Sequence, residues 1–397
     1  MPEDTLHADV ERMRPELVTL RRHFHQHPEL SFEETETAKE IAARLRELGI
    51  ETREGVGGTG IVGLIQGEKP GPTLLVRADI DALPIEELSE TEYRSQTPGK
   101  MHACGHDGHI AIGLGLAELL MARRGELAGA VKLVFQPAEE RAAGAEAMIN
   151  DGVLRDPVPD ACLGLHLWSS GRVGTVSLQS GPIMASADEI IIHVRGKGGH
   201  GAMPHEAVDP IIIAAHIITA LQTLVSREVS PFAPVVLTIG SIHGGSAFNV
   251  IADEVEIKGT LRTYDEALRA HLKERIASLA GGIAVSMRGE ARCSVGAGTG
   301  PCVNDAGMTA LVRSAVVATL GEKGLPEGDA RVTPSDDMSA FLAAAPGCYF
   351  FVGAGNSERG ITAPHHNARF DIDEESLPIG LEIMARATLA YLAKREP

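Results

Sequence analysis

The succession of strands and helices changes in the middle of this chain, and that change constrains the fold more than any other feature. Up to about residue 185, and again after about residue 296, short apolar runs of strand length alternate with helical stretches. Strands that alternate with helices predict an α/β layered domain. Between residues 186 and 295 the order becomes strand, helix, two strands and helix, which is typical of a small α+β sandwich. We therefore expect an α/β domain of residues 1–185 and 296–397, with an α+β domain of residues 186–295 inserted into it.

Apolar runs and helical periodicity predict where the individual elements lie. In the α/β domain we expect strands at Gly60–Gln66, Thr73–Ala78, Ala130–Gln136, Ala161–Leu167 and Cys348–Gly353, and helices at 9–23, 35–48, His109–Arg124, Gly144–Asp151 and Pro378–Lys394. In the inserted domain we expect strands at Glu189–Val194, Val235–Ile239 and Val255–Leu261, and helices at about Pro210–Ser226 and Asp265–Ala280. The length of 397 residues agrees with two domains, because it exceeds the size at which a single hydrophobic core keeps growing.

The net charge and the cysteine content limit which classes of partner we expect and in which cellular compartment we expect the protein. The net charge of −18 argues against nucleic acid and against anionic membrane surfaces. Five scattered cysteines fit a reducing cytosol better than a disulfide framework. The acidic segment Met1–Asp4 lacks the apolar core of a signal peptide, and the apolar helix at Pro210–Val225 is too short and too polar to span a bilayer. We therefore expect a soluble, cytoplasmic protein.

The stretch Met101–His109 concentrates groups that can bind a metal or transfer a proton. It holds one thiol, three imidazoles and a carboxylate directly before an apolar, helix-like run. A thiolate and an imidazole two residues apart, such as Cys104 and His106, can converge on a metal where the backbone turns, and Gly105 between them permits a tight turn. Taken alone, the tripeptide is equally compatible with a buried cysteine in a histidine-rich loop.

Suitable groups also follow four of the predicted strands. Asp79 and Asp81 follow the strand at Thr73–Ala78, and Glu139 and Glu140 follow the strand at Ala130–Gln136. The other two strands deliver His166 and, shortly after the strand end, His365 and His366. Sites in open α/β sheets lie just beyond the carboxyl ends of the strands, so four such coincidences favour an active site over surface loops.

The types of these side chains indicate a metal centre. Thiolate, neutral imidazole and carboxylate together suit a first-row divalent ion such as zinc, manganese, cobalt or nickel. Their number is about what two metals, roughly 3.5–4 Å apart and bridged by one ligand, require. Of the adjacent pair Glu139 and Glu140, one carboxylate can bind metal while its neighbour holds a proton.

Several motifs resemble the M20 metallopeptidase family, and more narrowly its amidohydrolase branch. That branch contains hippurate hydrolases, indole-acetyl-amino-acid hydrolases and N-acyl-amino-acid amidohydrolases. The motifs are Met101–His109, Phe135–Glu140 and Gly196–His205, strengthened by Arg22–Leu30, Arg77–Pro84 and Phe248–Ile251. The resemblance covers nearly the whole chain. It implies two divalent metal ions per subunit and hydrolysis of N-acetyl, N-benzoyl or aryl-acyl amino acids to a carboxylate and a free amino acid.

The resemblance also implies the roles of the site residues. Cys104 is the bridging ligand, His106 and His166 bind one metal, Glu140 and a late histidine bind the other, and Glu139 is the general base. Relatives place the late histidine seven residues before an acidic or amide position, here Asp373, which favours His366 over its neighbour His365.

Asp79 and three residues of the inserted domain complete the implied site. Asp79 matches a carboxylate that orients a ligand, while Arg77 stands where other branches carry a metal-binding histidine. The inserted domain is implied to be a lid and dimerisation domain, and its His200 to reach into the partner subunit's site in a homodimer and stabilise the oxyanion. Asn249 and Arg262 correspond to substrate contacts, with Arg262 able to grip a carboxylate. Both residues also have ordinary alternatives, a capped turn for Asn249 and a sheet-surface arginine for Arg262.

Three other functions compete with this interpretation. The chain could be a metallo-dipeptidase or carboxypeptidase of the same family, or a non-catalytic homologue that binds metal. The intact Glu139 and the complete set of five candidate ligands argue against the non-catalytic homologue. Alternatively, Cys104 could be a covalent nucleophile with His106 or His102 as its base, but Glu139 and Glu140 would then have no role.

Overall fold

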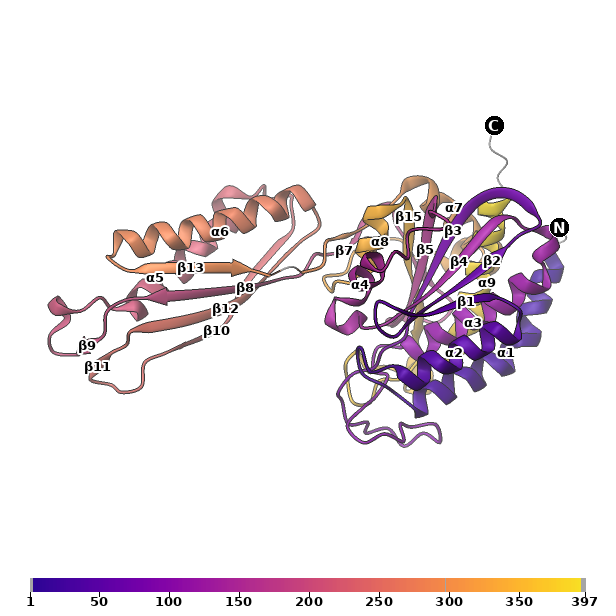
Figure 1. Ribbon diagram of the computed structural model, residues 1–397, viewed down its shortest axis with the longest axis horizontal. Coiled ribbons are helices and arrows are strands. Elements are labelled where there is room, and N and C mark those ends of the chain that lie inside the picture. The colour runs from indigo at the N-terminus through magenta and orange to yellow at the C-terminus, as the bar shows by residue number, and fades with distance from the viewer. Residues whose placement is uncertain (1–2, 297, 394–397) are drawn as a thin grey trace. The chain divides into compact units, whose positions relative to one another are not determined.

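A computed structural model describes residues 3–296 and 298–393, with the side chains of residues 3 and 4 left out. The described chain forms two compact units, drawn in Figure 1. One comprises residues 3–183, 303–330 and 337–393, and the other comprises Met184–Cys302 and Arg331–Asp336. The predicted fold class is confirmed, since an α+β unit interrupts an α/β unit. The segment Arg331–Asp336, which we expected in the α/β domain, belongs to the inserted unit, where Val332 bridges to Met184 and the Thr333 carbonyl accepts a hydrogen bond from Arg262.

The α/β unit is built on a seven-stranded sheet in the order β1-β2-β4-β3-β5-β15-β6. The strands are β1 (Glu51–Val56), β2 (Gly60–Gln66), β3 (Lys69–Asp79), β4 (Ala128–Gln136), β5 (Ala161–Arg172), β6 (Val176–Ser177) and β15 (Gly347–Gly355). The four central strands β4, β3, β5 and β15 are parallel, whereas β1, β2 and β6 pair in antiparallel fashion. Every residue of β15 is buried, as expected of a parallel strand covered on both faces.

Helices cover both faces of this sheet (Figure 1). The helices of this unit are α1 (Glu3–Gln26), α2 (Thr35–Glu47), α3 (His106–Ala122), α4 (Gly144–Asn150), α7 (Ala306–Leu320), α8 (Met338–Ala344) and α9 (Ser376–Leu392). Consecutive residues of β5 show the two layers, because Gly164 faces Met338 of α8 while Leu165 packs at Gly380 of α9. Helix α3 is buried on nearly all sides, which explains why its sequence is apolar all round.

The inserted unit has a four-stranded antiparallel sheet in the order β10-β12-β8-β13. Its elements are β8 (Asp188–Arg195), α5 (Pro210–Thr223), β10 (Val235–Gly244), β12 (Glu254–Thr263), α6 (Glu266–Ser286) and β13 (Glu290–Val295), with the short pair β9 (Gly199–His200) and β11 (Val250–Ile251). Alternate residues of β8 are buried in a core shared with α5 and α6, so both helices lie on one face of the sheet. Asp209 and Asp265 cap the two helices by accepting backbone N–H groups.

Helix α5 and the helical turn that follows it, Pro210–Glu228, are long and apolar enough to cross a membrane by length and composition alone, so the expectation that this segment is too short and too polar was wrong on that criterion. In the structure this helix buries Ile213, Ala214, Ile217 and Leu221 in the core of the inserted unit. A single buried stripe of this kind is what a helix lying on a sheet presents.

Candidate metal centre

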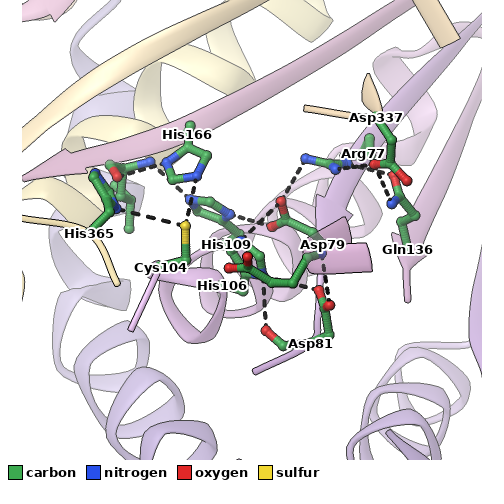
Figure 2. Close-up of polar contacts among 12 residues, drawn as sticks. Arg77, Asp79, Asp81, Cys104, His106, His109, Gln136, His166, Asp337 and His365 are labelled. Atoms are coloured by element: carbon green, nitrogen blue, oxygen red, sulfur yellow. Dashed lines mark hydrogen bonds and ion pairs between the residues drawn. The ribbon is translucent and has the colours of Figure 1, made fainter. Parts of the chain in front are cut away.

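The predicted residues of the α/β unit gather where the central parallel strands end. Asp79 is the last residue of β3 and pairs in register with Gln136, the last residue of β4. His166 lies in β5, and Cys104 directly precedes the Gly105 turn that starts α3. Figure 2 shows the Cys104 thiol, the imidazoles of His106 and His166, and Asp79 directed toward one another.

Cys104 lies at the centre of this cluster. Its Sγ is 3.5 Å from Nε2 of His166, and one ligand atom from each of Cys104, His106 and His166 lies within 4.8 Å of the others. One ligand atom from each of Cys104, Glu140 and His366 likewise lies within 4.8 Å of the others. Cys104 therefore belongs to two groups of potential ligands at once, which is the arrangement that a bridging ligand requires.

Backbone hydrogen bonds orient the two buried imidazoles. A carbonyl oxygen can only accept, so Nδ1–H of His166 donates to Leu167 O at 2.8 Å and Nδ1–H of His106 donates to Asp81 O at 2.9 Å. In the neutral rings the lone pair then resides on Nε2 in both residues. Nε2 of His106 is buried and has no hydrogen-bond partner among the described residues. When the rings are neutral, both therefore direct an unprotonated Nε2 at the cluster, as metal-ligating histidines do.

The two adjacent glutamates approach the cluster from the other side. Ala138, in a left-handed conformation, turns the chain after β4 into the short helical turn Glu139–Arg141, and its N–H donates to the buried Glu34 carboxylate. Glu140 lies 3.3 Å from Nε2 of His366, and its buried Oε1 has no hydrogen-bond partner in the described part of the chain. One ligand atom each of His106, Glu139 and Glu140 also lie within 4.8 Å of one another.

The neighbouring histidines 365 and 366 have different surroundings. Ser169 N–H donates to Nε2 of His365 at 3.1 Å, so the proton of the neutral ring is on Nδ1, which lies 3.8 Å from the Cys104 sulfur. The ring of His365 also packs against Trp168. Both nitrogens of His365 are therefore engaged, whereas His366 directs Nε2 at Glu140 from a left-handed backbone position. This geometry favours His366 as the ligand.

The charges of the cluster favour a bound cation. Burial raises the pKa of the Cys104 thiol well above its usual value, and the Glu140 and Glu139 carboxylates raise it further. Burial lowers the pKa of His106, but Asp79 and Asp81 outweigh it and raise this pKa to about 10. Burial lowers the pKa of His166. A divalent ion would supply the positive charge that these acidic groups otherwise obtain from a proton. The thiol, the imidazoles and the unpartnered oxygen of Glu140 are also the ligand types that such ions take, so the residues fit a metal.

Asp79 is held by Arg77 and His109 through contacts that the sequence did not reveal. One carboxylate oxygen accepts a hydrogen bond from Arg77 at 2.7 Å, and the other accepts from Nδ1 of His109. Nε2 of His106 is 3.5 Å from Asp79. Arg77 in turn donates to Gln136 and Asp337 (Figure 2). Gln136, at the end of β4, has the strand-end position that could have marked it in the sequence.

The other three predicted residues lie in the inserted unit. His200 is exposed in β9 and pairs with Val250, and the carbonyl of the adjacent Asn249 accepts a hydrogen bond from Gly201 N–H at 2.8 Å. Arg262 lies on β12, where it donates to the Thr333 carbonyl at 3.1 Å. The seven predicted residues of the α/β unit are therefore gathered at one place, whereas His200, Asn249 and Arg262 belong to a separate unit.

Comparison with known proteins places the chain among metal-dependent hydrolases. The family described as Peptidase family M20/M25/M40 matches residues 75–390. The chain is 41% identical to N-acetyl-L-cysteine deacetylase of Bacillus subtilis over 95% of its own length and 88% of that protein. It is 40% identical to thermostable carboxypeptidase 2 of Saccharolobus solfataricus, covering 98% of both chains. A crystal structure from Bacillus subtilis, described as a dinuclear metal-binding peptidase of the M20 family, matches with a TM-score of 0.84 and 34% identity over 96% of this chain and 99% of that one.

Proposed function

We propose, from the premise that this chain belongs to peptidase family M20/M25/M40 and to its amidohydrolase branch, that it cleaves N-acyl amino acids with two divalent metal ions. Membership of the family makes the chain a metal-dependent hydrolase that acts on amide bonds. The products of the proposed reaction are a carboxylate and a free amino acid. The observation that carries the proposal is the position of Cys104, which is shared by two groups of potential ligands beside Glu139 and Glu140.

In this proposal Cys104 would be the ligand shared by the two ions, which would be manganese, zinc, cobalt or nickel. His106 and His166 would hold one ion, and Glu140 and His366 would hold the other. Bound there, the ions would polarise the amide carbonyl and lower the pKa of an attacking water. The burial of Cys104, His106 and His166 keeps bulk water from these three ligands and strengthens their electrostatic interactions.

Glu139 is the proposed general base. Its carboxylate lies within 4.8 Å of the His106 and Glu140 ligand atoms and is only partly buried, so it can reach both the metal ligands and a bound substrate. It would accept the proton of the attacking water and deliver that proton to the leaving amine. Asp79 holds surrounding imidazoles rather than substrate, through its contacts with His109 and His106.

His200 is the proposed oxyanion donor. Ala202 N–H donates to Nδ1 of His200 at 3.1 Å, so the neutral ring carries its proton on Nε2 and offers an N–H group to a developing negative charge. We propose that it acts in the partner subunit's site, with Asn249 and Arg262 binding the substrate and Arg262 holding its carboxylate.

Action in trans requires a homodimer, and the inserted unit offers a surface for one. Strand β10 is at an edge of its sheet, where backbone N–H and C=O groups are available for pairing, and it exposes Val236 and Ile242. Helix α5 packs beside β10 and exposes Ile211 and Ile212. Exposed apolar surface next to an open sheet edge is characteristic of a protein–protein contact.

The proposed location is the cytoplasm. The five cysteines are unpaired, which supports a soluble protein in the reducing cytoplasm.

A panel of substrates tests this function and its nearest competitor. The 40% identity to a carboxypeptidase makes peptide hydrolysis the second candidate. N-acetyl, N-benzoyl and indole-acetyl amino acids should be hydrolysed faster than dipeptides and blocked peptides when the protein is supplied with manganese, zinc, cobalt or nickel. A preference for peptides with every metal would favour the carboxypeptidase, and no hydrolysis of any amide despite bound metal would favour a binding protein.

A further inference from the structure

We propose that His109 is a positioning residue that fixes the backbone of Leu167 and thereby aims Nε2 of His166 at Cys104. This inference rests on the proposed metal site, because its consequence is the direction in which His166 offers a ligand. His109 lies in the first turn of helix α3, which begins at His106, and is 2% exposed.

The two ring nitrogens of His109 have opposite roles. Leu167 N–H donates to Nε2 at 2.9 Å, and since a backbone N–H can only donate, Nε2 is the unprotonated nitrogen. The proton therefore resides on Nδ1, which donates to Asp79. Asp79, His106 and His109 lie close enough together to hold a metal ion, but His109 has no nitrogen left for one. Its hydrogen bonds identify it as a support for the site rather than as a ligand.

Leu167 transmits the effect of His109 to His166. The N–H of Leu167 is held by His109, and its carbonyl accepts the Nδ1–H of His166 at 2.8 Å. That second bond sets the tautomer and orientation of His166, leaving Nε2 3.5 Å from the Cys104 sulfur. The ring of His109 also meets the ring of His166 edge to face, with centroids 4.7 Å apart. His109 thus restrains both the backbone and the imidazole of His166.

A buried ionic network holds His109 in turn. The Asp79 carboxylate accepts a hydrogen bond from Nη1 of Arg77 at 2.7 Å. Arg77 also donates hydrogen bonds to Gln136 at 2.9 Å and to Asp337 at 3.1 Å. The Asp337 carboxylate in turn accepts hydrogen bonds from the side-chain amide of Gln136 at 2.7 Å and from Ala145 N–H at 2.9 Å. The hydrogen bonds therefore run without a break from α4 and the end of β4 through Arg77, Asp79 and His109 to the ligand in β5. Figure 2 shows the part that joins Gln136, Arg77, Asp79 and His109.

The alternative is that His109 is a core histidine whose loss only destabilises the fold. The two roles differ in what a substitution changes. A positioning role requires one donor and one acceptor at this place, so His109→Gln should restore much of what His109→Leu removes. A packing role requires only an apolar group of similar size, so His109→Leu should be the better tolerated of the two.

Cobalt binding tests the proposal, measured as affinity and as the visible spectrum, with thermal unfolding of the metal-free proteins recorded in parallel. Outer partners of metal-ligating histidines typically contribute about 10–100-fold in metal affinity. We expect His109→Leu to bind cobalt about 10–100-fold more weakly with altered ligand-field bands, and His109→Gln to stay within a few-fold of the wild type. His102→Leu is the matched control, because His102 is also buried in this stretch but its ring has no hydrogen-bond partner among the described residues.

Three results would overturn the proposal: wild-type cobalt binding by His109→Leu, an equal loss in His102→Leu, or labelled-histidine NMR of the metal-free protein showing the His109 proton on Nε2. Failure of the metal site itself gives a different result. In that case the wild-type protein would bind no cobalt, or Cys104→Ala would retain the sulfur-to-cobalt absorption band of the wild type.

Discussion

The candidate metal centre in the α/β unit and the His200 region of the inserted unit are built in contrasting ways. Three candidate ligands of the metal centre, Cys104, His106 and His166, are buried, and His106 and His166 are held by directional hydrogen bonds to backbone carbonyls. His200 is exposed in the short pairing of β9 with β11, Asn249 is exposed directly before β11, and the His200 ring accepts a hydrogen bond from Ala202 N–H. The contrast supports two parts of the proposal: that the α/β unit is preorganised for metal chemistry, and that the exposed groups of the inserted unit act outside their own unit.

The largest effect should come from removing the shared ligand. We expect Cys104→Ala to lose at least one metal equivalent and all measurable activity, because no other side chain belongs to both ligand groups around the thiol. Elemental analysis and hydrolysis assays check this. Cys104→Asp should be the mildest replacement, since a carboxylate can also bridge two metals. Two bound metals in Cys104→Ala would contradict the assignment.

Glu139→Gln should separate metal binding from proton transfer. The amide keeps the shape of the side chain but cannot accept a proton, so kcat should fall by about 10²–10⁴-fold while metal content and unfolding temperature are unchanged. Steady-state kinetics with elemental analysis measures both. If the variant kept more than about a tenth of the wild-type kcat, the general base would have to be another residue.

The His200 region should show a smaller effect that depends on the subunit. Loss of one oxyanion donor typically costs about 10²–10³-fold in kcat, so we expect this for His200→Ala without loss of metal. Mixing His200→Ala with Glu139→Gln then tests action in trans: a heterodimer has one site with both defects and one with neither, so activity should return. No recovery, once mass spectrometry shows heterodimers, would place His200 in its own subunit's reaction or outside catalysis.

Arg262→Ala should have the smallest effect of the four. We propose that Arg262 binds the carboxylate on the amino-acid part of the substrate. Its loss should then raise KM about tenfold or more and leave kcat nearly unchanged, because a hydrogen bond to a charged group contributes about 1.5–3 kcal/mol. Arg292→Ala is a matched control, because Arg292 also lies on a strand of the same sheet but pairs with Glu290. Equal KM values for wild type and Arg262→Ala would make Arg262 an ordinary surface residue.

Elements with a buried apolar run could be predicted from the sequence, and polar edge strands could not. Strand β2 has the predicted bounds Gly60–Gln66, because nearly all of its residues are buried and its sequence is therefore a recognisable apolar run. Strand β1 (Glu51–Val56) was missed, since most of its side chains are exposed and polar at the edge of the sheet. The helix predicted to begin at His109 begins at His106, because the glycines at 105 and 108 hid its first turn.

The site could be predicted in its residue types but not in its hydrogen bonds. Motifs identified the family, which the comparisons confirm, and the roles assigned to Cys104, Glu139 and His366 stay predictions. The contact of His365 with Ser169 and that of His109 with Leu167 join residues 196 and 58 positions apart. No local pattern encodes such contacts, because they depend on how β5 meets α3 and the segment after β15 in the folded unit.

Chelation followed by metal add-back tests the central claim most directly. The wild-type protein, assayed on an N-acetyl amino acid, should lose its activity on removal of metal and regain it as two equivalents of manganese, zinc, cobalt or nickel are bound per chain. Alkylation of Cys104 in the metal-free protein should block that recovery, whereas the metal-loaded protein should be protected. Full activity in the chelated protein, or recovery after Cys104 has been alkylated, would contradict a dinuclear centre bridged by this thiol.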